Sequence, residues 1–353
     1  MLERLSPNTM AQLKKWGFLL FWIAVLPVLP IAAYMGRETG TQDYWAWLIY
    51  FTVFGIIPVL DYIVGKDPSN PDEQTEVPLL SQEKIYRVFP LILGSVWLGV
   101  LYFGGHIFVS NDYSLLGQIG WILSIGTLGG AIAIVLAHEL VHKDERIENW
   151  FGGLLLSSVC YAGFKVEHIR GHHVFVATPD DGASAKFNQS VWHFLPRALK
   201  HNFLTAWQLE ADRLKRKGLK PLSVHNELIW WYAISGLFAL SFFLLWGWMG
   251  ALFFLLVGFV AGSTLEVINY VEHYGLHRRL LENGKYERIT PAHSWNSNYF
   301  LTNLALFQLQ RHSDHHAYGK RRYQVLRHYE DSPQLPAVWT YETAMMPPEE
   351  VIA

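Results

Sequence analysis

Cysteine is nearly absent from this chain of 353 residues, because Cys160 is its only thiol. A single thiol excludes internal disulfides, CxxC zinc ribbons and iron–sulfur clusters, all of which need several cysteines. Internal repeats at solenoid periods and low-complexity segments are also lacking in the sequence. If the chain carries out redox chemistry, its electrons must therefore come from another protein.

Charge is scarce as well: 16% of the residues are charged, whereas 51% are hydrophobic. Six stretches are apolar and long enough to cross a bilayer as helices. They cover roughly residues 17–35, 44–64, 88–109, 115–142, 228–249 and 250–271. We therefore predict an all-α polytopic membrane protein with six transmembrane helices, in which residues 1–353 form a single membrane-embedded catalytic domain.

Basic residues are almost missing from one side of this predicted bundle. With six spans, the N-terminus and the segments 65–87, 143–227 and 272–353 share one side, and they contain every Lys and Arg except Arg37. Lys and Arg accumulate on the cytoplasmic side of membrane proteins. We therefore expect both termini, the segment 143–227 and the segment 272–353 to be cytoplasmic.

Histidine, in contrast, is abundant and clustered. Nine of the 16 histidines fall into four groups: His138 and His142; His168, His172 and His173; His273; and His312, His315 and His316. Neutral imidazole is a common metal ligand, and nine imidazoles exceed what one ion can hold. Residues four apart share a helix face, whereas adjacent residues point about 100° apart, so the adjacent histidines could serve different ions. The pattern predicts a two-metal site.

Six further polar residues lie beside or one helical turn from these histidines: Glu139, Glu167, Glu266, Asn269, Glu272 and Asp314. We expect them to orient imidazole N–H groups and to balance the metal charge. A rival interpretation is that one carboxylate bridges the metals. The string His138–His142 is also the HExxH signature of zinc proteases, with Glu139 as base, but a protease leaves the other seven histidines unexplained.

The motifs HELVHK from His138, EHIRGHH from Glu167, NYVEHYGL from Asn269 and LQRHSDHHA from Leu309 closely resemble those of the bacterial integral-membrane alkane 1-monooxygenases, within the histidine-box desaturase and hydroxylase superfamily. The resemblance spans nearly the whole chain. It implies that two non-haem iron ions are held by His138, His142, His168, His172, His173, His273, His312, His315 and His316. It also implies O2-dependent conversion of n-alkanes to 1-alkanols in the inner membrane.

The same resemblance implies rubredoxin as electron donor, supplied by rubredoxin reductase and NAD(P)H. Some family members carry a fused rubredoxin, which needs four cysteines that this chain does not have. We expect the alkane, O2, rubredoxin and membrane lipid as partners, and no nucleic acid. Basic residues that could receive an acidic redox partner are Arg311, Lys320, Arg321 and Arg322.

Methylene C–H bonds are weaker than methyl C–H bonds. Attack on a terminal methyl group therefore requires a site that controls which carbon of the alkane reaches the metals. We therefore expect a narrow apolar channel that runs from the bilayer to the metals and presents only the end of the alkane. The nearest alternative is a di-iron fatty-acid desaturase or hydroxylase, which would need a site for a polar headgroup. A metal transporter is the alternative that is not an enzyme, and it would place ionisable groups near the membrane midplane.

Overall fold

The computed structural model describes residue 2 and residues 5–335, and these are helical or irregular throughout. Only isolated β-bridges, and no strand, occur within the described part of the chain. The all-α prediction is therefore confirmed. The last 18 residues of the predicted segment 272–353, from 336 onward, lie outside the described residues.

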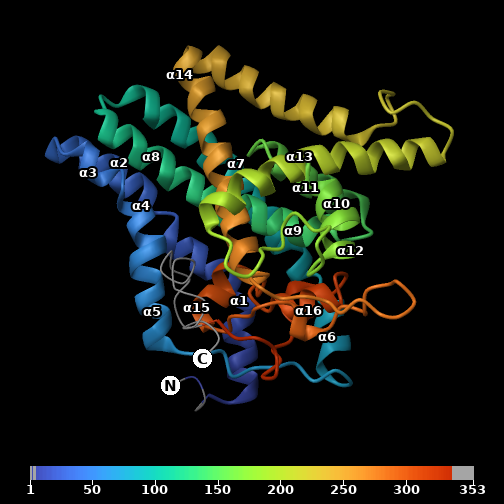
Figure 1. The fold of residues 1–353 in the computed structure, drawn as a ribbon. Helices are drawn as coiled ribbons and strands as arrows, with labels where there is room; N and C mark the ends of the chain where they lie inside the picture. Colours follow the sequence, from blue (N-terminus) through green and yellow to red (C-terminus); the bar gives the residue numbers. More distant parts are fainter. Residues whose placement is uncertain (1, 3–4, 336–353) are drawn as a thin grey trace.

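The helical elements follow the chain in the order shown in Figure 1. Their bounds are α1 Pro7–Val25, α2 Val28–Thr39, α3 Gln42–Trp45, α4 Leu48–Phe51, η2 Thr52–Ile56, α5 Ile57–Val64, α6 Glu76–Gln82, α7 Ile85–Ser110, α8 Leu115–Leu128, η3 Gly129–Ile134, α9 Val135–Val141, α10 Arg146–Ser157, α11 Phe164–Glu167, η4 His168–His172, α12 His173–Phe175, α13 Val191–Arg216, α14 Glu227–Glu272, η5 Pro291–His293, α15 Phe300–Ala305, α16 His312–Ala317 and η6 Tyr323–Val325.

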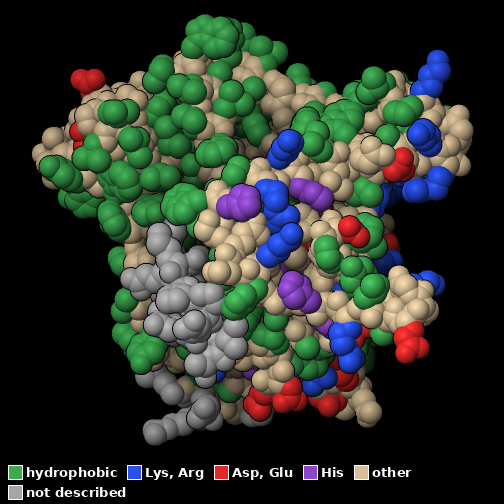
Figure 2. Space-filling model, in the orientation of Figure 1, with side chains coloured by type: hydrophobic (Ala, Val, Ile, Leu, Met, Phe, Trp, Pro, Cys, Tyr) green, Lys and Arg blue, Asp and Glu red, His purple; other side chains and the backbone are tan. Residues whose placement is uncertain are grey.

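Five continuous helical stretches are long and apolar enough to cross a membrane: Asn8–Thr39, Gln42–Val64, Ile85–Ser110, Leu115–Val141 and Glu227–Glu272. The chain is therefore a multi-pass membrane protein. Hydrophobic side chains gather on the upper part of the molecule in Figure 2, over α2, α8 and α14, whereas most of the charged side chains lie lower or to the right. The transmembrane surface and the polar part of the protein are thus separated.

The 46-residue helix α14 contains a sharp break, and its two halves run in different directions in Figure 1. Trp246 and Gly247 have non-helical backbone angles, and Gly247 has a φ of 65°, which favours glycine. A Cβ atom on Gly250 would lie 2.5 Å from the Phe242 carbonyl oxygen, so this turn admits no side chain there. The predicted boundary between the fifth and sixth spans, at residues 249 and 250, lies a few residues after the break. The count of six crossings stays a prediction.

The fourth predicted span packs closely against the second half of α14. It consists of α8, a π-helical turn η3 and α9, and small residues face α14 along its length. A Cβ atom on Gly126 would lie 2.5 Å from the Val260 side chain, and one on Gly129 would lie 3.1 Å from the Ala261 Cβ. Small residues allow such close helix contact in membranes. This contact brings the end of α9 beside the end of α14.

Candidate metal centre

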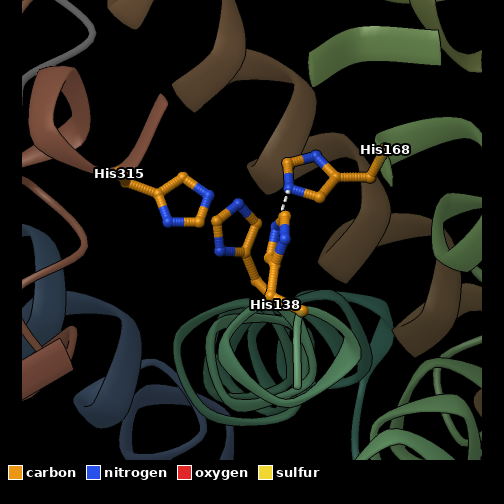
Figure 3. A group of neighbouring side chains, drawn as sticks. His138, His168 and His315 are labelled. Carbon is orange, nitrogen blue, oxygen red and sulfur yellow. Dashed lines mark hydrogen bonds between the residues drawn. The ribbon is translucent and has the colours of Figure 1, made fainter. Parts of the chain in front are cut away.

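The nine clustered histidines come together from four segments of the chain. These segments are α9 with the residue that follows it, η4 with α12, the residue after α14, and α16. Figure 3 shows rings from three of these segments, with those of His138, His168 and His315 directed toward a common centre. The side chains divide into two groups, which we call cage A and cage B.

Cage A contains His138, His142, His168 and His315, whose nearest ligand atoms all lie within 4.8 Å of one another. We add His173, because its Nε2 atom lies 3.1 Å from Nε2 of His168 and 3.0 Å from Nε2 of His315. Cage A therefore has five imidazoles, which come from three segments of the chain.

Cage B contains His172, His273, His312 and His316, again with ligand atoms within 4.8 Å of one another. The Nε2 atom of His316 lies 2.9 Å from that of His312 and 3.2 Å from that of His172. The Nε2 atoms of His273 and His312 are 3.1 Å apart. All four side chains are buried.

Each pair of adjacent histidines is divided between the cages. His172 belongs to cage B and His173 to cage A, while His315 belongs to cage A and His316 to cage B. The π-helical turn η4 contributes to this division, because a π turn hydrogen-bonds from residue i to i+5 and is wider than an α turn. His168 consequently shares a cage with His173, five residues later, instead of with His172.

The nitrogen positions fit metal binding. Imidazole nitrogens held about 2.1 Å from one ion, at bond angles of about 90–110°, lie about 3.0–3.4 Å apart. The Nε2 contacts within the cages, at 2.9–3.2 Å, are close to this range. A neutral imidazole carries one N–H, so a group of Nε2 atoms in mutual contact is a poor hydrogen-bond network but a suitable set of metal ligands. The histidine clusters could therefore bind metal.

Electrostatics keep most of these imidazoles neutral. Burial, and after it the neighbouring imidazoles, lower the pKa values of His168, His173, His315, His312 and His316 well below the usual value. Neutral imidazole is the form that coordinates a metal. These side chains are therefore already neutral at neutral pH and can bind an ion without first releasing a proton.

His172 differs because an ionised carboxylate faces it. Its Nδ1 atom lies 3.0 Å from Oδ2 of Asp181, and both side chains are buried. Burial alone would lower the pKa of His172, but the Asp181 carboxylate outweighs burial and raises it. Burial opposes ionisation of Asp181, yet His172 and other partners lower the pKa of Asp181 to about 2. Sequence reasoning missed Asp181, which lies nine residues after His172 in an irregular segment.

Among the six polar residues expected beside the histidines, Glu272 is the one whose side chain contacts a cage nitrogen. Its Oε2 atom lies 3.2 Å from Nε2 of His312, the nitrogen that faces cage B. Glu139 pairs with Lys143 at 2.9 Å. Glu167 lies 4.0 Å from Nε2 of His201, which belongs to neither cage.

The remaining three residues bind elsewhere in the protein. Glu266 accepts a hydrogen bond from the Tyr161 hydroxyl and another, at 3.2 Å, from Nδ2 of Asn269. Asp314 accepts hydrogen bonds from Arg321 and from the Tyr329 hydroxyl, and these contacts tether α16. The side chains of Glu266, Asn269 and Asp314 thus help to hold in place the helices that carry the histidines.

Arg311, which the sequence suggested as a docking residue, is fully buried, so this interpretation is wrong for that residue. Its guanidinium donates to Asp67 Oδ2 at 3.0 Å and to the Leu326 carbonyl oxygen at 2.8 Å. Asp67 also pairs with Lys14 at 2.7 Å. Arg311 directly precedes His312, so the buried ion pairs anchor the start of α16.

An apolar cavity of about 140 Å³ lies between the membrane-spanning helices, and a smaller one of about 20 Å³ lies deeper. Gly130, Val135, Ile268 and Leu306 line both cavities, so the two adjoin. The inner cavity is also lined by His138 of cage A and His312 of cage B, together with Glu272. An apolar space thus leads from the helix bundle to both cages.

Comparison with known proteins agrees with this architecture. The family model described as "Fatty acid desaturase" matches residues 113–343, which include all nine histidines. The chain is 63% identical to alkane 1-monooxygenase 2 of Alcanivorax borkumensis, over 99% of this chain and 92% of that protein. It is 57% identical to alkane 1-monooxygenase 2 of Pseudomonas aeruginosa, over 95% of this chain and 89% of that protein.

A more distant relative is the hydroxylase component XylM of a xylene/toluene monooxygenase from Pseudomonas putida, at 28% identity over 92% of this chain and 85% of that protein. The much higher identity to the alkane 1-monooxygenases distinguishes the branch. The chain therefore belongs to the fatty acid desaturase family and, within it, to the alkane 1-monooxygenases.

Proposed function

We propose that this protein is an O2-dependent alkane 1-monooxygenase that converts n-alkanes to 1-alkanols at a non-haem di-iron centre. The observation that carries this proposal is the pair of adjoining apolar cavities, because the inner cavity reaches one histidine of each cage. The names of the relatives, which are 51–63% identical over nearly the whole chain, support the same activity.

In this proposal, each cage holds one iron ion. Cage A supplies His138, His142, His168, His173 and His315, and cage B supplies His172, His273, His312 and His316. Iron bound there would supply the redox chemistry that activates O2, which zinc cannot. The protein contributes the positions of the imidazoles, the burial that excludes water, and the carboxylates that offset the metal charge.

The cavities select the substrate and its orientation. The described residues that line the outer cavity include no charged side chain, and its polar side chains are the threonines Thr127, Thr264 and Thr302 together with the Trp22 indole. An alkane gains about 0.8 kcal/mol for each methylene that it buries there. The inner cavity, at about 20 Å³, is too small for a bulky group, so the end of the alkane is what reaches His138 and His312.

Two carboxylates have defined positions in this mechanism. Asp181 accepts the Nδ1–H of His172 and thereby directs Nε2 of that ring into cage B. Glu272 lies against both the inner cavity and His312 Nε2, where a carboxylate can offset metal charge or hold a proton close to the substrate. Glu139, Glu167, Glu266, Asn269 and Asp314 act further away, by holding the helices that carry the ligands.

The proposed setting is the bacterial inner membrane, with six crossings and both termini in the cytoplasm, as the distribution of Lys and Arg predicts. The electrons come from rubredoxin, which rubredoxin reductase and NAD(P)H keep reduced. One cysteine in the whole chain supports an external donor.

The test combines iron content per chain with product analysis. Purified protein supplied with iron, O2, a reductant and octane should bind two iron ions per chain and form 1-octanol. An alkene or a hydroxylated acyl chain as the preferred product would favour a desaturase or lipid hydroxylase instead. Uptake of metal into proteoliposomes without any O2-dependent product would favour a transporter.

A further inference from the structure

Four basic residues lie together where α13 ends and the connection to α14 begins. Lys215, Arg216, Lys217 and Lys220 are all exposed, and no acidic residue occurs in the sequence between the first and the last of them. Figure 2 shows Lys and Arg side chains at the right-hand end of the molecule, where Figure 1 places this connection. The structure thus presents four positive charges at one end of the helix pair.

The carboxylates closest to these residues in the chain are bound to other groups. Glu210 and Glu227 each lie 2.7 Å from the Arg170 guanidinium. Both carboxylate oxygens of Asp212 accept from Nε2 of Gln208 at 3.2 Å. Within the described part of the chain, none of the four basic residues forms an ion pair. Their charge is therefore available to an anionic partner.

Exposed apolar side chains follow directly after the basic residues. Leu222 is 80% exposed, Val224 is 70% exposed and Trp230, in the first turn of α14, is 55% exposed. The exposed Leu237 and Leu244 continue this apolar surface along α14. Because α14 is apolar enough to cross a membrane from Glu227 onward, the connection lies at the membrane surface. We call the following residues the α13–α14 tip: Lys215, Arg216, Lys217, Lys220, Leu222, Val224 and Trp230.

Hydrogen bonds fix the shape of this tip. The Trp230 indole donates to the Val224 carbonyl oxygen at 2.8 Å, so the exposed ring is fastened to the connection. The buried Asn226 amide donates to the Pro221 carbonyl oxygen at 2.8 Å, and its Oδ1 accepts from the Leu228 N–H at 2.9 Å. A connection that is already ordered loses little conformational entropy when it binds a partner.

We propose that the α13–α14 tip is a binding site for anionic phospholipid. The ammonium and guanidinium groups contact the phosphate oxygens of the headgroups, and Leu222, Val224 and Trp230 enter the layer between headgroups and acyl chains. Basic residues beside a membrane-spanning helix attract anionic lipid in this way. Apolar side chains next to the charges favour a lipid surface over a soluble acidic protein, because the lipid removes them from water.

The experiment compares two brominated lipids with the same acyl chains, phosphatidylglycerol and phosphatidylcholine, added to the full-length protein in detergent micelles. Bromine quenches the fluorescence of tryptophans that touch the acyl chains. The chain has 15 tryptophans, so the signal of Trp230 is the difference between a protein and its Trp230→Phe counterpart. Each Lys or Arg near an anionic surface contributes about a fivefold gain in affinity. Trp230 should therefore be half-quenched at a mole fraction of phosphatidylglycerol at least about tenfold lower than that of phosphatidylcholine.

A triple variant tests whether the charges of the tip cause this preference. Lys215→Gln, Lys217→Gln and Lys220→Gln together should remove most of the difference between the two lipids and leave the quenching by phosphatidylcholine unchanged. The matched control removes three positive charges elsewhere. It combines Lys186→Gln, Lys285→Gln and Arg288→Gln, all of them exposed residues in irregular segments outside the membrane-spanning helices. This control should keep the full preference for phosphatidylglycerol.

Three results would overturn the inference. Equal quenching of Trp230 by the two lipids in the unmodified protein would show that the tip does not select charge. No quenching of Trp230 by either lipid would place the tip outside the membrane, where a soluble acidic partner is the better occupant. An equal loss of preference in the two triple variants would reveal a general effect of net charge. The measurement needs neither iron nor turnover, so its failure leaves the proposed function standing.

Discussion

Replacement of Asp181 by Asn tests whether the carboxylate outside cage B controls metal binding. In the structure, Asp181 Oδ2 faces His172 Nδ1 at 3.0 Å and accepts a hydrogen bond from Ser184 Oγ at 2.6 Å, while its Oδ1 accepts from the Ala183 N–H at 3.1 Å. The amide has nearly the same shape but no charge. The substitution therefore removes the electrostatic pull on the His172 ring and keeps the packing.

The expected magnitude follows from the pKa of Asp181. A decrease from 3.8 to about 2 corresponds to about 2 kcal/mol of favourable interaction with the partners of this carboxylate. Loss of a carboxylate that orients a ligating histidine typically weakens metal affinity about 10- to 100-fold, or about 1.4–2.7 kcal/mol. Both values predict that Asp181→Asn binds iron at cage B about 10- to 100-fold more weakly at pH 8.

The pH at which iron is lost should shift downward in Asp181→Asn, even though this variant binds iron more weakly at pH 8. Asp181 raises the pKa of His172, so in the unmodified protein a proton competes with the metal for this ring as the pH falls through that raised value. Asp181 itself stays ionised until the pH approaches about 2, so it acts throughout this range. Asp181→Asn should therefore lose its remaining iron affinity at lower pH than the unmodified protein does.

The assay is iron retained per chain after dialysis against graded chelator, at pH 8 and at pH 6. The control is Asp180→Asn, because Asp180 is an exposed neighbour with the same chemistry. Iron retention by Asp181→Asn equal to that of the unmodified protein at pH 8 would refute the role of Asp181. If Asp181→Asn and Asp180→Asn lose the same amount of iron relative to the unmodified protein, the effect is a general one on this segment instead of an effect on His172.

Three further changes probe the cage, the cavity and the packing. His315→Ala should abolish octane hydroxylation and lower the iron content toward one ion per chain, and normal turnover by this variant would contradict the two-cage proposal. Val135→Phe, at the junction of the two cavities, should slow octane oxidation while the iron content stays constant, and lipid-facing Val109→Phe serves as its control. Gly126→Leu should lower the thermal unfolding temperature in detergent, because its Cβ would lie 2.5 Å from Val260 and overpacking costs about 1–3 kcal/mol; an unchanged unfolding temperature would show that α8 and α14 separate easily.

Features of the chain that depend on composition and local spacing could be predicted from the sequence. Apolar stretches long enough to span a bilayer identify a helical membrane protein, because lipid leaves no other way to satisfy the backbone of a single apolar segment. The i, i+4 spacing of His138 and His142 places both rings on one helix face, and both lie in cage A. The expectation that adjacent histidines diverge also agrees with the structure.

Tertiary contacts decided the rest. The sequence does not show that a π turn pairs His168 with His173, since the choice between α and π turns depends on packing around η4. Asp181 and the burial of Arg311 are likewise invisible in the sequence, because both residues find their partners through contacts between irregular segments.

The sequence by itself thus determined the membrane class, the set of nine histidines and the family, since these follow from residue types and short-range periodicity. Only the tertiary structure decided how the nine rings divide between two cages, which carboxylates reach them, and where an apolar cavity adjoins them. These properties arise where α9, η4, α14 and α16 meet, and the meeting depends on close helix packing between residues more than 100 positions apart in the chain.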